Sequence, residues 1–108
     1  MNGPFIPKSL QRIVNRYADA FAPESIVLFG SYAKGTNKAG SDMDLLVVTK
    51  TDTDFTSYLR RAHQLAADCF PRVDVVFVSS EEVKKATLAS NAFLISALDC
   101  GIVLYPPN

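Results

Sequence analysis

The sequence predicts an α/β (α+β) domain in which helices flank a mixed β-sheet, and three observations support this fold class. Four short apolar runs have the length and bounding residues of strands. Segments with helical spacing of apolar residues lie between and beside these runs. Hydrophobic residues make up 48% of the 108 residues, which is enough to build a core. Since no repeat, linker or low-complexity segment interrupts this pattern, we expect one domain over residues 1–108.

The N-terminal part predicts a helix, a strand and the start of a short second helix. Residues 7–25 carry an apolar stripe with helical spacing, in which Ser9 is the candidate N-cap and Pro23 ends the helix. The stripe consists of Leu10, Ile13, Val14, Tyr17, Ala18 and Phe21. Residues 25–29 then predict a buried strand that ends at Gly30, where a short helical turn begins.

The middle of the chain predicts two strands joined by a helix. Residues 42–49 form an apolar run that favours a central strand covered on both faces. Residues 51–70 show helical spacing, with Thr53 or Asp54 as the candidate cap. Residues 72–78 predict a third strand.

The C-terminal part predicts two helices and a closing strand. Ser79 and Glu82 have the spacing of a capping box, which favours a helix start. Residues 90–101 predict a further helix with Gly101 as its C-terminal stop, and residues 102–105 predict the last strand. The predicted order is therefore helix, strand, loop, strand, helix, strand, helix, helix, strand.

Charge and composition exclude several classes of protein. Lys+Arg and Asp+Glu number 11 each, so the basic excess of a protein that tracks long nucleic acid is absent. We find neither a signal-peptide pattern nor a stretch of transmembrane length. The two cysteines, Cys69 and Cys100, lack metal-ligand spacing and are expected to be buried thiols in a reducing compartment. We therefore expect a cytoplasmic protein that binds neither a membrane nor long nucleic acid.

Three aspartates predict a metal site at the strand ends. Asp42 and Asp44 lie two residues apart at the start of a strand, so their side chains project from the same face. Neighbouring carboxylates resist ionisation unless a cation lies between them, and Mg²⁺ binds through one or two carboxylates plus substrate phosphates. Asp74 begins another apolar strand, where burial disfavours an acid. If that strand lies beside the first, three carboxylates can hold one or two metal ions, as two-metal phosphoryl-transfer sites do.

The loop before these aspartates predicts a phosphate site. Gly30 and Ser31 lie where a strand ends and a helical turn begins, so backbone N–H groups and the Ser31 hydroxyl can contact an anion. Lys34 and Lys38 add positive charge nearby. No G-x-x-x-x-G-K-[ST] or G-x-G-x-x-G motif is present, which excludes a P-loop and a dinucleotide-binding fingerprint. Phosphate contacts at one end and metal carboxylates at the other describe a nucleoside-triphosphate site.

Each of these features also has a structural interpretation. An Asp-x-Asp pair is commonly a solvated strand start, and Asp74 could pair with Arg72. The only histidine, His63, is interpreted as structural. Tyr32 could stack on a base or simply cover the edge of the sheet. Because the combination of features is much rarer than its parts, we favour the functional interpretation.

Taken together, "GSYAKG", "SDMDLLVV" and "VDVVFV" resemble the motifs of the polymerase-β-like nucleotidyltransferase superfamily. Gly-Ser, ten residues and Asp-x-Asp is similar to the motif of its smallest branch, the minimal nucleotidyltransferases. The resemblance implies the polymerase-β-like fold, with Asp42, Asp44 and Asp74 as catalytic residues and Mg²⁺ ligands. The nucleotide-binding residues that it implies are Gly30, Ser31, Lys34 and Ser41. Many relatives carry an arginine where this chain has Tyr32, so Lys34 is expected to supply the missing charge.

The resemblance also implies an activity and a partner. A hydroxyl of the acceptor attacks the α-phosphorus of the co-substrate ATP and releases pyrophosphate, with Asp74 helping to deprotonate that hydroxyl. Minimal nucleotidyltransferases that resemble this chain often act as antitoxins, transferring AMP to a tyrosine of a small helical HEPN toxin protein. Because no acceptor-binding domain follows the core elements, we expect a second copy or another protein to supply the acceptor surface.

Two other functions remain open. The chain could be a catalytically weak antitoxin or subunit that masks its partner by contact, through residues 91–95 or the N-terminal helix. It could also transfer a nucleotide to a small molecule of the aminoglycoside type, which would require an acceptor pocket formed by a dimer.

Overall fold

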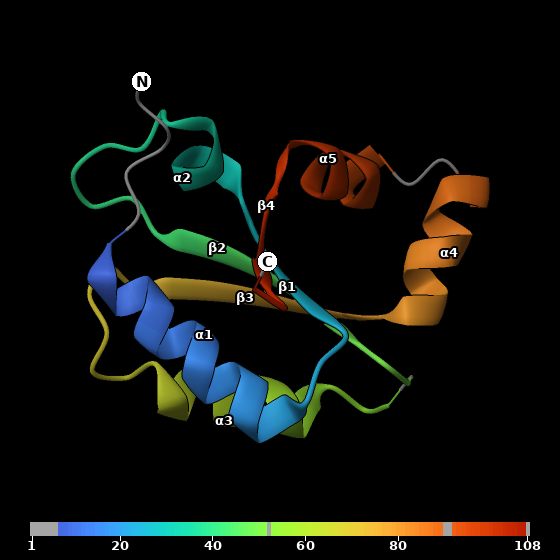
Figure 1. Cartoon of the computed structure of the whole chain (residues 1–108), viewed down its shortest axis with the longest axis horizontal. Helices are drawn as coiled ribbons and strands as arrows, with labels where there is room; N and C mark the ends of the chain where they lie inside the picture. The colour runs from blue at the N-terminus through green and yellow to red at the C-terminus, as the bar shows by residue number, and fades with distance from the viewer. Residues whose placement is uncertain (1–6, 52, 90–91, 108) are drawn as a thin grey trace.

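The computed structural model describes residues 7–51, 53–89 and 92–107, and its elements follow the order that the sequence predicts (Figure 1). They are α1 (Lys8–Phe21), β1 (Ser25–Phe29), α2 (Gly30–Lys34), β2 (Met43–Thr49), α3 (Thr56–Leu65), β3 (Val73–Ser79), α4 (Ser80–Ala89), α5 (Ala92–Cys100) and β4 (Ile102–Tyr105). Residue 52 of the predicted helix at 51–70, and residues 90 and 91 of the predicted helix at 90–101, lie outside the described residues. The predicted fold class, a mixed sheet with flanking helices, is confirmed.

The strands form one sheet in the order β3-β2-β1-β4. β1 pairs antiparallel with both β2 and β4, whereas β2 and β3 are parallel and are joined through α3. A parallel pair needs a long crossover, which α3 provides. β2 is therefore a central strand, and six of its seven residues are buried, as its apolar sequence predicts.

The alternation of side chains along the strands divides the core into two layers. On one face, α1 and α3 cover the sheet (Figure 1), and the core layer there includes Ile26, Leu45 and Phe77. On the other face, α4 and α5 pack against residues one position away, such as Val27 and Leu46. Because adjacent strand residues point to opposite faces, every other strand position belongs to the same layer. This division decides which face carries the polar residues at the strand ends.

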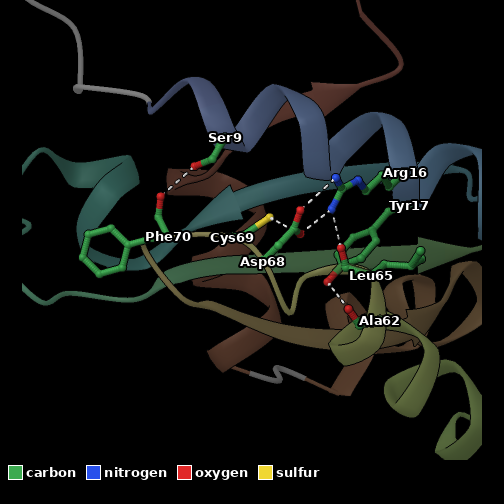
Figure 2. Close-up of polar contacts among 8 residues, drawn as sticks. All are labelled: Ser9, Arg16, Tyr17, Ala62, Leu65, Asp68, Cys69 and Phe70. Carbon is green, nitrogen blue, oxygen red and sulfur yellow. Dashed lines mark hydrogen bonds and ion pairs between the residues drawn. The ribbon is translucent and has the colours of Figure 1, made fainter.

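The junction of α1 and α3 is fastened by side chains of α1 that bind carbonyl groups around the end of α3 (Figure 2). The Arg16 Nη1 atom donates to the Leu65 carbonyl and to the Asp68 Oδ1 atom, each at 2.7 Å. The buried Tyr17 hydroxyl donates to the Ala62 carbonyl at 3.0 Å. The last carbonyls of a helix have no partner within it, so Arg16 satisfies the Leu65 carbonyl, whereas the Ala62 carbonyl also accepts from the Ala66 N–H at 3.1 Å.

Two predicted helix boundaries are wrong, each for a tertiary reason. Ser9 is not an N-cap, because α1 begins at Lys8 with Pro7 as the capping position, and the Ser9 hydroxyl donates instead to the Phe70 carbonyl. The helix predicted over residues 51–70 is shorter and ends at Leu65, where the polar contacts from α1 meet it. Its start does use the predicted side chain, since Asp54 accepts a hydrogen bond from the Thr56 N–H at 3.0 Å.

The C-terminal signals are confirmed, with one change of mechanism. The Ser79 hydroxyl accepts from the Glu82 N–H at 3.1 Å, so Ser79 caps α4 as predicted. Gly101 does follow α5, but its role is steric, because a Cβ there would lie 2.3 Å from the Ala97 carbonyl oxygen and 2.5 Å from Val27. The cysteine prediction is half wrong: Cys69 is buried in the turn after α3, whereas Cys100 is exposed at the end of α5. Among the described residues, no helix is long and apolar enough to span a membrane.

Candidate active site

Two aspartates are direct neighbours at the ends of the parallel strands. In the register of β2 and β3, Asp44 is the partner of Asp74. Residues paired in this way project from the same face of a sheet. That face also carries Leu46 and Val76, so it is the face covered by α4 and α5. The condition on which the sequence argument depended, that the third strand pairs beside the second, is therefore met.

Asp44 is half-buried, and a third aspartate precedes it by two residues. Burial raises the pKa of Asp44, and the negative charges of Asp74 and Asp42 raise it further. Asp42 lies two residues before Asp44 and is exposed, as is Asp74. A half-buried carboxylate with two like charges beside it is stabilised by a cation, which would reverse the effect of both neighbours.

Gly30, the first residue of α2, lies against this acidic group. A Cβ placed on Gly30 would come within 2.2 Å of the Asp44 Oδ2 atom and 3.1 Å of its carboxyl carbon. The φ angle of Gly30 is +74°, a conformation that side chains rarely adopt. Its neighbour Phe29 is the register partner of Asp44 on β1. Both the space and the backbone conformation therefore require glycine at the point where the loop meets the carboxylates.

The donor set has the chemistry that a hard divalent cation requires. All three side chains offer carboxylate oxygens, which Mg²⁺ and similar ions prefer. As the side chains stand, no three acidic, histidine or cysteine groups within residues 7–51, 53–89 and 92–107 are gathered tightly enough to coordinate one ion. Asp42 and Asp74 are exposed, so their side chains have room to change rotamer when a cation binds. The residues present thus fit the metal in chemical type, and Asp44 and Asp74 share one face of the sheet.

The basic and hydroxyl residues predicted to contact phosphate lie in α2 and in the loop that follows it. Ser31 follows Gly30 in the first turn of α2 and is partly exposed, and its carbonyl accepts from the Thr36 N–H at 2.9 Å. Lys34 is exposed in the last turn of α2, and Lys38 is exposed in the following loop. Within the described part of the chain the one ion pair joins Arg16 and Asp68, so both lysine charges are available to an anionic ligand.

Ser41 is occupied within its own loop. Its hydroxyl accepts from the Lys38 N–H at 2.9 Å, and its N–H donates to the Lys38 carbonyl at 3.0 Å. These two bonds close a tight turn directly before Asp42. The turn holds the first aspartate at the head of β2, which is a positioning role that the sequence did not indicate.

The structural alternatives for three other residues are resolved. The Tyr32 side chain is 5% exposed and belongs to the core layer under α1 and α3, so it covers the sheet and does not stack on a base. Arg72 makes no ion pair with Asp74 among the described residues. His63 lies exposed on α3, which covers the opposite face from the carboxylates, in line with its structural interpretation.

A cavity of about 340 Å³ beside Gly30 was missed by the sequence reasoning. Its walls come from the end of β1, from α2 and from α5. The residues that line it are Phe29, Gly30, Lys34, Ala92, Phe93, Ser96, Ala97 and Cys100. The sequence predicts α5 as a helix and residues 91–95 as a candidate contact surface, and nothing in the sequence indicates that α5 faces α2.

The comparisons with known proteins agree with this geometry. The family model described as polymerase beta, nucleotidyltransferase, matches residues 9–105. The chain belongs to the polymerase β nucleotidyltransferase family. Among solved structures it is similar to a candidate nucleotidyltransferase from Sulfolobus solfataricus, with 26% identity and a TM-score of 0.54 over 72% of this chain and 70% of that one. A comparison with curated protein sequences finds no match.

Membership of the polymerase β nucleotidyltransferase family confirms the broader part of the resemblance noted in the motifs. The family match runs from the first turn of α1 to the end of β4. Nucleotidyltransferases of this family generally use a divalent metal ion and a nucleoside triphosphate, which is the pair of ligands that the acids and the basic loop suit. The narrower predictions, namely the metal, the acceptor and the partner, are taken up below as proposals.

Proposed function

We propose that this nucleotidyltransferase transfers AMP from ATP, with Mg²⁺, to a tyrosine hydroxyl of a partner HEPN-type toxin protein, and thereby acts as an antitoxin. One observation carries the catalytic part of the proposal. Asp44 and Asp74 are register partners on one face, and Gly30 lies against Asp44 at the head of the basic loop. A site for a cation and a site for a polyphosphate thus share a boundary.

The strand order supports a separate task for each side of the proposed site. β3 is an edge strand, so the exposed Asp74 is open to an acceptor that approaches from outside the sheet. Asp44 lies on the central strand β2, between Asp74 and the loop that begins at Gly30. Gly30, Ser31 and Lys34 would hold the triphosphate on the β1 side. The acceptor and the nucleotide would therefore meet at Asp44 from opposite directions.

The proposed reaction uses these positions directly. The acceptor hydroxyl oxygen forms a bond to the α-phosphorus, the bond to the oxygen that bridges the α- and β-phosphorus breaks, and pyrophosphate leaves. The proton of the hydroxyl passes to Asp74, the carboxylate nearest the acceptor side. Asp42, Asp44 and Asp74 would hold Mg²⁺, which neutralises developing negative charge when it is bound. Lys34 would offset the charge of the departing pyrophosphate.

An exposed aromatic side chain shortly before β3 in the sequence supports a protein as acceptor. Phe70 is 80% exposed, and a hollow of about 430 Å³ lies between Phe70 and the loop at residues 37–40. Both segments that form this hollow continue along the chain to site residues, the loop to Asp42 and the segment after Phe70 to Asp74. Large exposed aromatic residues commonly anchor protein interfaces. A partner docked on Phe70 would hold its tyrosine near the acceptor side of the site. By contrast, α1 buries its apolar stripe in the core and offers no such surface.

The test is to incubate the protein with labelled ATP, Mg²⁺ and the protein encoded by the neighbouring gene, which the proposal expects to be of HEPN type. We expect label on a tyrosine of the partner, and no label with the Asp42→Asn, Asp44→Asn double variant. Absence of label on a partner that binds the protein would contradict the proposal.

The exposed Phe70 and Phe93 also favour a second candidate function, in which the protein masks its partner by contact alone. In that case the double variant would still neutralise the toxin, whereas Phe70→Ala would not.

A further inference from the structure

The cavity between α2 and α5 has mostly apolar walls, whereas the rest of the candidate site is charged and polar. Figure 1 shows these two helices side by side on one face of the sheet. The cavity measures about 340 Å³ and is lined mostly by apolar and aromatic residues of β1 and α5. Sites for small organic ligands usually span about 300–1,000 Å³ and have apolar walls with a few polar groups. The cavity therefore has room for one flat organic ring system.

Its location is continuous with the carboxylates. Gly30 lines the cavity and also touches the Asp44 carboxylate. Phe29, which lines the cavity from β1, is the register partner of Asp44, so both side chains lie on the same face. A ligand whose phosphate end reaches Asp44 can thus place its other end in the cavity without crossing the sheet.

Two aromatic rings form the apolar wall. The rings of Phe29 and Phe93 pack edge to face, with centroids 5.6 Å apart and planes at 85°. Phe93 is 50% exposed, so a large part of its surface remains open to a ligand. An exposed aromatic face in a cavity is a stacking platform, and a nucleobase is the part of a nucleotide that stacks.

We propose that this cavity binds the nucleobase of the substrate nucleotide, with Phe93 of α5 as the stacking residue. The proposal rests on the proposed function, since it takes the phosphates to lie at Gly30 and Asp44. It assigns to α5 a role in the site, whereas the predicted site residues all lie between β1 and β3.

The chemistry of the cavity walls also sets the selectivity among bases. Its side chains that can form hydrogen bonds are those of Lys34, Ser96 and Cys100. None of the lining residues is an amide or a carboxylate, the groups that read the edge of a base in matched donor and acceptor pairs. Stacking tolerates every base because each has a π-face. The protein is therefore expected to bind ATP, GTP, CTP and UTP with affinities within about tenfold of one another.

The experiment compares ligands with and without a base. Dissociation constants of ATP and of inorganic tripolyphosphate are measured by calorimetry, with Mg²⁺, for the wild type and for Phe93→Ala. We expect wild type to bind ATP more tightly than tripolyphosphate. Loss of one stacking contact should weaken ATP binding roughly tenfold in the variant and leave tripolyphosphate within about twofold. Phe93→Tyr should retain wild-type affinity, because it keeps the ring.

Controls separate failure of this inference from failure of the proposed function. Leu59→Ala removes an exposed apolar side chain of α3, on the opposite face of the sheet, and should change neither affinity. If ATP and tripolyphosphate both bind, but Phe93→Ala affects neither or weakens both equally, the base does not stack on Phe93 and the inference is wrong. If neither ligand binds the wild type, the phosphate site itself is absent, and the proposed function fails together with the inference.

Discussion

Gly30 and Asp44 are in direct contact, although they lie on different elements at opposite ends of a long loop. A Cβ on Gly30 would lie 2.2 Å from the Asp44 Oδ2 atom, closer than real atoms approach. The segment between them carries Lys34 and Lys38. The contact therefore brings the start of this basic segment against the carboxylates at its end. The glycine is required for close approach as well as for its backbone conformation.

Gly30→Ala should therefore damage stability and function together. Gly30 and Gly35 both have φ of +74°, but a Cβ on Gly35 would have nothing within 4 Å. Alanine in that conformation costs about 1–2 kcal/mol at either position. Forced overlap with Asp44 should add about 1–3 kcal/mol at Gly30 only. Urea unfolding of both variants measures the difference, and nucleotide transfer should be lost in Gly30→Ala and retained in Gly35→Ala. Equal loss of stability in the two variants would show that the contact with Asp44 does not matter.

Asp44→Asn should make the stability of the protein nearly independent of divalent cations. The pKa of Asp44 is raised by burial and by Asp74 and Asp42, so the folded state binds more protons than the unfolded state just above the ordinary pKa of an aspartate. Stability therefore falls as pH rises through that interval, and at neutral pH the charged carboxylate is destabilising without a cation. The neutral amide removes this cost, so without Mg²⁺ the variant should be at least as stable as the wild type.

The matched measurement adds Mg²⁺ at increasing concentration and follows the melting temperature. A ligand present at ten times its dissociation constant stabilises by about 1.4 kcal/mol, so the wild type should melt at higher temperature with Mg²⁺. Asp44→Asn should show little of this increase. The control is Asp54→Asn, which neutralises a carboxylate outside the acidic group and keeps an oxygen that can accept from the Thr56 N–H. It should keep the response to Mg²⁺. A wild-type response in Asp44→Asn would argue against the aspartates as the cation site.

The elements and the acidic group could be predicted because their signals are local. Alternation in β2 and β3 places Asp44 and Asp74 on a face, and a right-handed crossover through α3 then sets the two strands side by side. Contacts between segments that are distant in sequence have no local pattern from which they could be predicted. Phe29 and Phe93 meet only because α5 returns to β1, and no spacing in the sequence records this.

The errors at the helix ends have the same origin. The apolar periodicity continues past Leu65 toward Cys69, and it predicts a longer helix than the structure has. What ends α3 there is a turn whose carbonyl and carboxylate groups bind Arg16, a residue of α1 far away in sequence. Ser9 was misassigned as a cap because its actual partner, the Phe70 carbonyl, is equally distant.

The ion pair of Arg16 and Asp68 should give stability a characteristic pH dependence. The hydrogen bond from Arg16 is the main cause that lowers the pKa of Asp68 below the usual aspartate range. The unfolded state then binds more protons, so this contribution is full above the unfolded pKa, about 3.9, and is lost as pH falls through the folded pKa. The difference in unfolding free energy between wild type and Asp68→Asn should therefore shrink as the pH of a urea titration is lowered from 7 toward 2.5. Asp19→Asn is the control, because the exposed Asp19 makes no ion pair within the described residues. A difference that stays constant with pH would mean that the pair contributes nothing in solution.

Two adjacent serines at the start of α4 allow the contribution of a helix cap to stability to be compared with that of a surface contact. The buried Ser79 hydroxyl accepts from the Glu82 N–H at 3.1 Å, whereas the Ser80 hydroxyl donates to the exposed Glu24 carboxylate at 3.3 Å. Ser79→Ala leaves one of the first N–H groups of the helix without a partner, so it should lower the unfolding free energy by about 1 kcal/mol. Ser80→Ala should cost less than about 0.5 kcal/mol, because water replaces the lost partner at the surface. Urea unfolding at pH 7 distinguishes the two values.

Nucleotide transfer by the two variants tests whether the Ser79 cap matters to the site, since α4 packs on the same sheet face that carries Asp44 and Asp74. Equal costs for the two serines would show that α4 is held by its packing alone and that the cap adds nothing.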